Sequence, residues 1–277
     1  MNLLKKTREI CDLYKIKPTR SKGQNFLIKE EIYDEIVRAA EITKDDFVLE
    51  VGPGLGFLTA KLSKAAKKVV AVELDDKLAE FLRMATEAEK VGNVEIINMN
   101  VLDFNPFSIE DKKYKIVANL PYNITSVFLR KFLSETENKP ETMVLMLQKE
   151  VAERICATPG DMSLLTISVQ FYAYAEIVQY VPRNDFWPSP EVDSAVIKLT
   201  VHKASKVHKD KERDFFRLVK FGFSAKRKML KNNLASGFHI SQKEAEEKIV
   251  LAGFNPKCRA EDLGVEDWKK LFGKFYL

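Results

Sequence analysis

The sequence predicts an α/β fold in which helices cover both faces of a parallel sheet, followed by a small all-helical domain. Short apolar runs alternate with segments of helical periodicity over the first two-thirds of the chain, which is typical of such a sheet. A cluster of glycines follows the first of these runs, and the periodicity becomes entirely helical after a polar stretch at 202–211. These observations divide the chain into a basic lead-in at 1–29, an α/β domain at 30–201 and a helical domain at 207–277.

Each strand is predicted from a short apolar run, and each helix from apolar residues that recur every three or four positions. Parallel strands are expected at 47–51, 69–73, 94–97, 114–119 and 142–147. Amphipathic helices are expected at 30–41, 58–64 and 76–90. Two further runs, at 171–181 and 194–201, are separated by a proline-rich loop, which predicts an antiparallel hairpin at the edge of the sheet.

The composition is that of a soluble globular protein, with 45 % hydrophobic and 31 % charged residues. No apolar run approaches the roughly 18–20 residues that span a bilayer, and the first residues lack a signal-peptide core. Cys11, Cys156 and Cys258 are widely spaced and form no CxxC motif, which argues against a disulfide framework and a zinc site. We therefore expect a cytoplasmic protein without metal or membrane association.

Positive charge is concentrated in the last part of the chain. Residues 202–277 contain 18 Lys and Arg against 10 Asp and Glu, a net charge of +8, whereas the other 201 residues contain 27 against 30, a net charge of −3. A basic appendage on a near-neutral body favours a polyanionic partner, although a solvated surface would also be lysine-rich. Within the appendage, we assign phosphate contacts to Lys226, Arg227 and Lys228.

The glycine cluster has the form expected of a cofactor-binding loop. The segment Glu50–Gly56 reads EVGPGLG and joins a strand to a helix, and Glu73 ends the next strand, 21 residues after Gly52. Gly52 and Gly54 allow the backbone to turn tightly beside a ligand, while Glu73 can accept the hydroxyl protons of a ribose. Phe57 stands where a dinucleotide-binding loop needs glycine, so the pattern favours a Rossmann-like domain that binds S-adenosylmethionine.

The strand at 114–119 ends in Asn119, Leu120, Pro121 and Tyr122, a combination suited to methylating an exocyclic adenine amine. The lone pair of this amine is delocalised into the ring. Acceptors on the Asn119 side chain and the Leu120 backbone can draw its two protons out of plane and make the nitrogen nucleophilic. Pro121 stiffens the turn, and Tyr122 offers a ring face for an unstacked base.

An aromatic pair, Phe186 and Trp187, lies in the proline-rich loop of the predicted hairpin. Phe186 is a candidate for the second side of the base pocket, opposite Tyr122. Packing against the core is the alternative for both rings, and it is the stronger alternative for Trp187.

Together these motifs resemble the KsgA-type ribosomal RNA adenine dimethyltransferases. The resemblance extends over nearly the whole chain and includes 24–27 (QNFL), 50–56 (EVGPGLG), 72–75 (VELD), 119–122 (NLPY), 148–154 (QKEVAER), 186–195 (FWPSPEVDSA) and 223–230 (FSAKRKML). It implies that S-adenosylmethionine binds at Asn25, Leu27, Gly52 and Glu73, and that Asn119 and Tyr122 bind the target adenine. The implied partner is small-subunit ribosomal RNA in a pre-ribosomal particle, where two adjacent adenosines of the 3′-terminal hairpin loop are dimethylated. We separately expect the protein to be a monomer.

One position departs from the family pattern. Asn100 stands where the family usually has an aspartate that receives the adenine amine of the cofactor. Asparagine keeps an acceptor oxygen, so we expect Asn100 to bind the cofactor through a neutral and weaker hydrogen bond. Asp103, three residues later, is the alternative acceptor.

Three other functions share some of these features. Dimethyltransferases of large-subunit RNA typically have isoleucine where this chain has Leu120, and DNA adenine methyltransferases lack the basic helical tail. A ribosome assembly or RNA-binding factor without catalysis is the third alternative, and Asn100 is the residue that would favour it.

Overall fold

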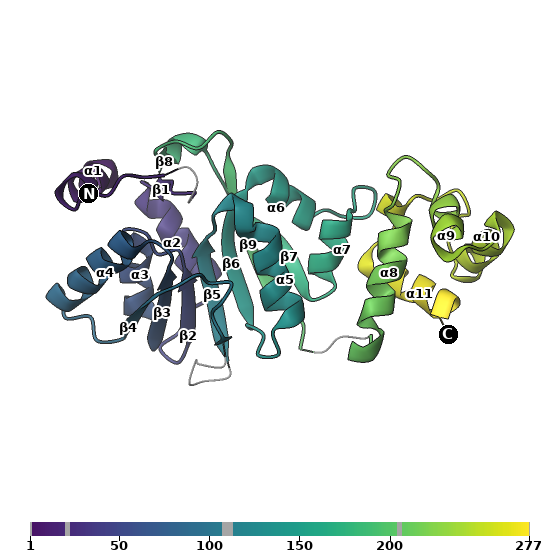
Figure 1. Cartoon of the computed structure of the whole chain (residues 1–277), viewed down its shortest axis with the longest axis horizontal. Helices are drawn as coiled ribbons and strands as arrows, with labels where there is room; N and C mark the ends of the chain where they lie inside the picture. Colours follow the sequence, from purple (N-terminus) through teal and green to yellow (C-terminus); the bar gives the residue numbers. More distant parts are fainter. Residues whose placement is uncertain (1, 20–22, 107–112, 204–206, 277) are drawn as a thin grey trace. The chain divides into compact units, whose positions relative to one another are not determined.

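The computed structural model describes residues 2–19, 23–106, 113–203 and 207–276, and the chain forms two compact units (Figure 1). Unit 1 comprises Met1–Ala152 and Tyr174–Val201, and unit 2 comprises Glu153–Ala173 and His202–Leu277. Unit 2 thus includes 153–173, which the sequence analysis had placed in the range 30–201. The reason is aromatic packing, because the Phe171 ring lies 4.7 Å from that of Phe215.

Unit 1 contains a seven-stranded sheet with the order β4-β3-β2-β5-β6-β9-β7. Its strands are β2 (Phe47–Val51), β3 (Lys68–Glu73), β4 (Val94–Asn98), β5 (Tyr114–Asn119), β6 (Thr142–Gln148), β7 (Ala173–Val181) and β9 (Ser194–Val201). The first five strands pair in parallel, as predicted, and β9 runs antiparallel to β6. The last two strands are neighbours at the edge, with β7 outermost.

Apolar helix faces pack against this sheet. Unit 1 contains α1 (Leu3–Leu13), α2 (Glu30–Ala39), α3 (Phe57–Ala65), α4 (Asp76–Ala88) and α5 (Thr125–Arg130). Ile36 of α2 and Leu62 of α3 share one buried cluster with Val48, Val117 and Val144 of the central strands. Three strand side chains that alternate with these, Leu49, Ile116 and Leu145, are also fully buried. Burial on both faces explains why the central strands read as continuous apolar runs.

A separate two-stranded sheet ties the lead-in to the proline-rich loop. It pairs β1 (Phe26–Leu27) antiparallel with β8 (Phe186–Trp187). Sequence analysis did not predict this pairing, because two residues are too short to show alternation.

Unit 2 is helical, which confirms the predicted C-terminal helices. After α6 (Lys149–Ile155), which runs from unit 1 into unit 2, its helices are α7 (Leu164–Gln170), α8 (Glu212–Gly222), α9 (Leu230–Phe238), α10 (Gln242–Leu251) and α11 (Val265–Tyr276). Phe215, Leu218, Leu234, Ile249 and Trp268 form a fully buried core. The sequence analysis missed α5, α6 and α7, whose six or seven residues give too little periodicity to recognise.

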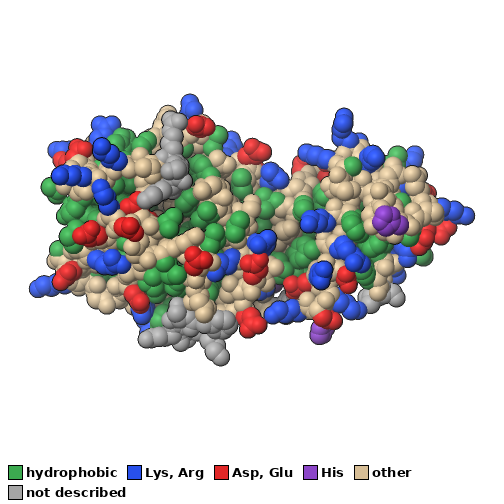
Figure 2. Space-filling view, in the orientation of Figure 1, with side chains coloured by type: hydrophobic (Ala, Val, Ile, Leu, Met, Phe, Trp, Pro, Cys, Tyr) green, Lys and Arg blue, Asp and Glu red, His purple; other side chains and the backbone are tan. Residues whose placement is uncertain are grey.

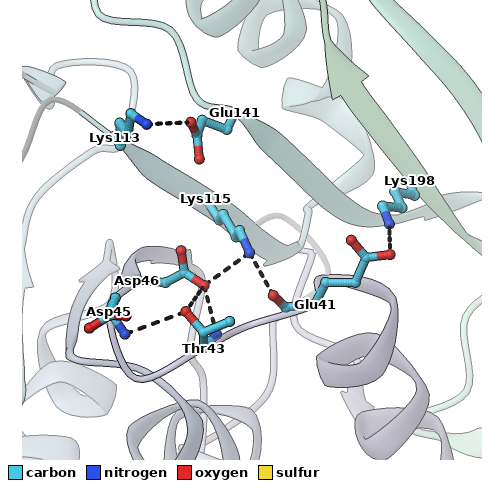
Figure 3. Close-up of polar contacts among 8 residues, drawn as sticks. All are labelled: Glu41, Thr43, Asp45, Asp46, Lys113, Lys115, Glu141 and Lys198. Atoms are coloured by element: carbon cyan, nitrogen blue, oxygen red, sulfur yellow. Dashed lines mark hydrogen bonds and ion pairs between the residues drawn. The ribbon is translucent and has the colours of Figure 1, made fainter.

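At the amino ends of the parallel strands, ion pairs join the sheet to the loop before β2 (Figure 3). Lys115 of β5 donates to the Asp46 carboxylate at 2.9 Å and to the Glu41 carbonyl at 2.6 Å. Lys198 of β9 pairs with the Glu41 carboxylate at 2.7 Å. Because parallel strands share one direction, this network lies at the edge opposite to the one where the glycine loop begins, and it leaves that edge available for a ligand.

None of the helices within the described part of the chain is long and apolar enough to cross a membrane. In the same part of the chain, no three His, Cys, Asp or Glu side chains come together as metal ligands would.

Candidate active site

The glycine loop after β2 has a backbone that only glycine adopts readily. Gly52, Gly54 and Gly56 have φ values of +66°, +59° and +78°, in the left-handed region. The Gly52 N–H donates to the Val72 carbonyl at 3.0 Å, which anchors the loop to the end of β3. A Cβ at Gly54 would lie 3.3 Å from the ring of Phe26. The loop therefore brings bare backbone to the carboxyl edge of the sheet.

Glu73, at the end of β3, is buried next to this loop and is 6 % exposed. One carboxylate oxygen accepts the Gly54 N–H at 3.1 Å, and the other accepts the Asp75 N–H at 2.9 Å. Burial raises the pKa of the Glu73 carboxyl, while these two backbone hydrogen bonds lower it. Each oxygen keeps a second lone pair for a ligand, since a carboxylate offers about four acceptor positions.

Asn119 ends β5 and lies beside the lead-in. Its side-chain amide donates to the Asn25 carbonyl at 3.5 Å, a long hydrogen bond that turns the amide nitrogen toward the lead-in. The side-chain oxygen consequently points away from the Asn25 carbonyl, because two acceptors facing each other would repel. Asn119 is half-buried, so this oxygen remains available to a ligand.

The other members of the NLPY motif have different environments. Leu120 is 1 % exposed, and its backbone N–H donates to the Met146 carbonyl at 3.2 Å. Pro121 lies against Gly23 of the lead-in, where an added Cβ would come within 2.9 Å of the proline ring. Tyr122 begins a short 3₁₀ turn and is half-buried. Its hydroxyl and that of Ser194 are 2.9 Å apart in a hydrogen bond.

One pocket of unit 1 brings most of the predicted cofactor residues together. Among the residues that line it are Asn25, Gly52, Gly54, Glu73, Asn100, Asn119 and Pro121. Leu120, Tyr122, Leu27 and Phe186 are not among the lining residues. Five chain segments that are distant in the sequence thus form a single cavity, and four of them lie where parallel strands end at the same edge of the sheet.

Leu27 and Phe186 face each other across the β1–β8 pair and belong to the core. They are 1 % and 4 % exposed. The Leu27 carbonyl accepts a hydrogen bond from the Tyr33 hydroxyl at 2.9 Å. That the Phe186 ring forms the second side of the base pocket stays a prediction, and in this structure the ring packs in the interior. Trp187 is the more exposed of the two aromatics and lies 5.8 Å from the Arg8 guanidinium.

Asn100 lies in the loop after β4 and lines the pocket, whereas Asp103 does not. The Asn100 side-chain oxygen accepts the Leu102 N–H at 2.9 Å, and Lys131 donates to the Leu102 carbonyl at 2.6 Å. These contacts fix the loop locally. Because Asn100 lines the pocket and Asp103 does not, Asn100 is the better candidate to contact a ligand there.

Sequence analysis overlooked Asn123 and two further polar residues of the pocket, Gln24 and Asp75. Both belonged to motifs that carried the resemblance, QNFL and VELD. Their neighbours had assigned roles, and nothing in the spacing indicated that Gln24 and Asp75 contact each other across 51 positions.

The basic segment of unit 2 forms a turn between α8 and α9. Lys226, Arg227 and Lys228 are all exposed there. The Asn233 side chain donates to the Gly222 carbonyl at 2.6 Å and to the Ala225 carbonyl at 3.1 Å, which pins the turn to α9. On the face drawn in Figure 2, Lys and Arg side chains are scattered over the surface of the helical unit among larger tan and green areas. The charge is therefore presented on an ordered turn.

Comparison with known proteins agrees with this arrangement. The model of the family described as ribosomal RNA adenine dimethylase matches residues 16–275. The chain is 45 % identical to a ribosomal RNA small subunit methyltransferase A of Dehalococcoides mccartyi, covering 98 % of this chain and 92 % of the relative. It is 38 % identical to the protein of the same name from Clostridium acetobutylicum, covering 98 % of each.

Two solved structures are similar over most of the chain. A dimethyladenosine transferase from Plasmodium falciparum superposes with a TM-score of 0.75 at 29 % identity, covering 89 % of this chain and 95 % of that one. The 23S rRNA methyltransferase ErmE gives a TM-score of 0.75 at 27 % identity, covering 91 % of this chain and 100 % of that one. The family match and the full-length relatives lead to one conclusion, that this chain belongs to the ribosomal RNA adenine dimethylase family.

Proposed function

We propose that this protein uses S-adenosylmethionine to dimethylate the N6 amines of two adjacent adenosines in the 3′-terminal hairpin loop of small-subunit ribosomal RNA. Full-length relatives named as small-subunit methyltransferases support the choice of RNA. The observation that carries the proposal is that Glu73 and Asn119 line the same pocket. Glu73 can accept the ribose hydroxyls of the cofactor, and Asn119 can accept the amine of the target adenine. The cofactor and the adenine must lie next to each other for methyl transfer.

The residues of the pocket fit S-adenosylmethionine. The bare backbone of Gly52 and Gly54 leaves space that side chains would fill, and the spare lone pairs of Glu73 suit two ribose hydroxyls. Asn25 and Asn100 supply further polar walls, with Asn100 as the acceptor for the adenine amine. Leu27 contributes from the core by supporting the lead-in. When bound, the cofactor supplies a methyl group on a positively charged sulfur.

Asn119 acts on the other reactant. Its side-chain oxygen accepts one proton of the adenine amine, and the Leu120 carbonyl accepts the second. Both acceptors draw the nitrogen lone pair out of conjugation with the adenine ring. Pro121 contributes by making the turn that carries these acceptors rigid. The enzyme then acts mainly by positioning, which contributes much of the acceleration when two reactants are aligned.

Tyr122 provides the ring face on which the target base lies after leaving its stack. Phe186 supports the lead-in from the protein core, because it pairs with Leu27 in the β1–β8 sheet. Lys226, Arg227 and Lys228 contact phosphates of the RNA, so affinity and base recognition reside in different parts of the chain. We further propose that the protein acts as a monomer on pre-ribosomal particles in the cytoplasm.

Methyl transfer to purified ribosomal subunits tests the function. Labelled S-adenosylmethionine is incubated in separate reactions with immature small subunits and with large subunits, both from a strain that lacks this methylation, and each RNA is analysed for dimethyladenosine. We expect two labelled adjacent adenosines in the small-subunit RNA. Label in large-subunit RNA alone would instead support the activity of the ErmE type, and no label in any RNA would leave a non-catalytic assembly factor.

Asn119→Ala provides the mechanistic test. We expect turnover to be abolished while S-adenosylmethionine binding, measured by calorimetry, changes by no more than a few-fold, because the lost acceptor acts on the target amine. Near-normal turnover of this variant would remove Asn119 from the mechanism.

A further inference from the structure

Gln24 occupies the point where the lead-in crosses the pocket. Its side-chain nitrogen donates to the Asp75 carboxylate at 3.2 Å. Its side-chain oxygen accepts the Thr19 N–H at 2.9 Å and the Thr19 hydroxyl at 3.3 Å. The amide orientation is therefore determined at both ends, since the nitrogen faces a carboxylate and the oxygen faces two donors.

Asp75 connects this contact to the cofactor side of the pocket. One of its carboxylate oxygens caps α4 by accepting the Lys77 and Leu78 N–H groups at 3.0 and 3.3 Å. The other oxygen accepts from Gln24, and the Asp75 N–H donates to Glu73. A continuous chain of hydrogen bonds therefore runs from the lead-in through Asp75 to the Glu73 carboxylate.

The lead-in and the β3–α4 turn both line the pocket and touch each other through Gln24 and Asp75. Residues 23–26 of the lead-in and residues 72–75 of the turn are among the lining residues. The lead-in is also held by the β1–β8 pair and by the hydrogen bond from Asn119 to the Asn25 carbonyl, whereas the Gln24–Asp75 contact joins it to the β3–α4 turn. The contact between Gln24 and Asp75 thus closes the pocket across its cofactor side.

We propose that Gln24 is a positioning residue for cofactor binding, which fastens the lead-in across the pocket through Asp75 and thereby keeps Glu73 in place. This inference rests on the proposed cofactor site. Loss of the contact opens one wall, so the cofactor dissociates faster. The chemical step at Asn119 changes less, because Asn119 is the last residue of β5 and is positioned by the central sheet.

A charge exchange between the two positions tests the inference. Gln24→Glu places a carboxylate against Asp75, and we expect S-adenosylmethionine to bind about tenfold more weakly, the scale of one lost hydrogen bond to a charged group. Asp75→Asn alone leaves two amide donors facing each other, with a similar loss. In the double variant Q24E/D75N the new amide donates to the new carboxylate, and we expect the affinity to return to within about threefold of the original.

The Asp75→Asn variant keeps the N-terminal cap of α4, since asparagine caps helices as well as aspartate does. Binding and dissociation are measured directly, by calorimetry and by chasing labelled S-adenosylmethionine with unlabelled S-adenosylhomocysteine. In steady-state assays we expect KM for the cofactor to rise in Gln24→Glu while kcat changes by less than about threefold. Gln242→Glu, the same chemical change at an exposed position of α10, serves as the matched control and should change neither quantity.

The outcomes separate this inference from the proposed site. Equal losses in Q24E and in the double variant, without rescue, would overturn the role of the contact. Glu73→Ala is measured in parallel. If it abolishes cofactor binding while the Gln24 variants bind normally, the site stands and the inference fails. If Glu73→Ala also binds normally, the proposed cofactor site itself is wrong.

Discussion

Tyr122 differs from the other residues of the NLPY motif because its hydroxyl already has a partner within the protein, the hydroxyl of Ser194. Ser194 is fully buried at the start of β9, so this bond fixes the tilt of a half-buried ring at the pocket edge. Burial also raises the pKa of Tyr122, which keeps the hydroxyl protonated at neutral pH. The ring face, rather than the hydroxyl, is then the part available to a base.

Two substitutions at Tyr122 separate the ring from the hydroxyl. Tyr122→Ala should weaken capture of the target adenosine by about 1–3 kcal/mol, the usual contribution of base stacking on an aromatic ring. Tyr122→Phe keeps the ring face and should lower kcat/KM for RNA only slightly, through a less restrained ring. Steady-state kinetics with immature small subunits measure both values. A Phe variant as impaired as the Ala variant would mean that the hydroxyl itself takes part.

Glu50 is a second residue whose behaviour follows from burial. It lies in β2, is 1 % exposed, and has the buried Thr59 hydroxyl beside its carboxylate, which lowers the pKa less than burial raises it. Burial raises the pKa of the Glu50 carboxyl from 4.5 to about 8, and the nearby Glu73 charge adds to the shift. The native state therefore favours a neutral Glu50 at and below neutral pH.

This shift predicts a pH-dependent stability with a definite sign. The folded protein binds a proton at Glu50 that the unfolded chain has released, so stability falls as the pH rises from about 4.5 toward 8. Glu50→Gln removes this dependence. Urea unfolding between pH 5 and 8 should show the wild-type free energy falling relative to that of the variant by up to about 1.4 kcal/mol per pH unit. Parallel pH curves for the two proteins would show that Glu50 does not titrate in this range.

At the scale of elements, the turn between α8 and α9 is the feature that connects charge with order. Asn233 fixes its backbone from α9, and three consecutive basic side chains are exposed on it. An ordered basic turn loses less conformational freedom on meeting phosphate groups than flexible lysines would. This favours the turn over the scattered lysines of unit 2 as a phosphate contact.

Replacing Lys226, Arg227 and Lys228 together with Glu tests the turn. Affinity for small subunits should fall strongly and its dependence on salt should flatten, because fewer counterions are released on binding. Cofactor affinity should stay unchanged. Titrations at several salt concentrations provide the slope, and a charge-matched control replaces the exposed Lys243, Lys257 and Lys274 with Glu. If both triple variants had equal effects, the turn would contribute to RNA binding only through its general positive charge and not through a specific phosphate contact.

The β1–β8 pair shows how a short element changes the role of a residue. Sequence analysis placed Phe186 at the base pocket because it precedes a rigid Trp-Pro-Ser-Pro segment. In the structure, its pairing opposite Leu27 directs the ring into the core cluster. A strand of two residues has no recognisable pattern, so the side on which its aromatic ring lies follows from the tertiary pairing alone.

For the whole molecule, one end of the parallel sheet is structural and the other carries the candidate site. The amino ends of the strands are joined to neighbouring segments by Lys115 and Lys198 (Figure 3). The carboxyl ends carry the glycine loop, Glu73 and Asn119 around one pocket. The family match extends over residues 16–275 and so includes the helices of unit 2. These basic helices are therefore part of the family fold together with the pocket.

The sequence by itself determined the fold class, the family and the order of the pocket motifs. Buried parallel strands read as apolar runs, and Gly52, Gly54 and Gly56 occupy left-handed positions that other residues adopt only with strain. Glu73 and Asn119 were recognisable because each directly ends such a strand. Patterns of this kind are local, and local patterns can be seen in a single chain.

Only the tertiary structure decided which side chains face the pocket. It separated Phe186, which is buried, from Asn100, which lines the cavity, although the sequence had made both candidate site residues. It also brought Gln24 to Asp75 and moved residues 153–173 into unit 2. Contacts between residues that are far apart in the sequence depend on packing and strand pairing, and such contacts leave no periodicity or spacing in the chain.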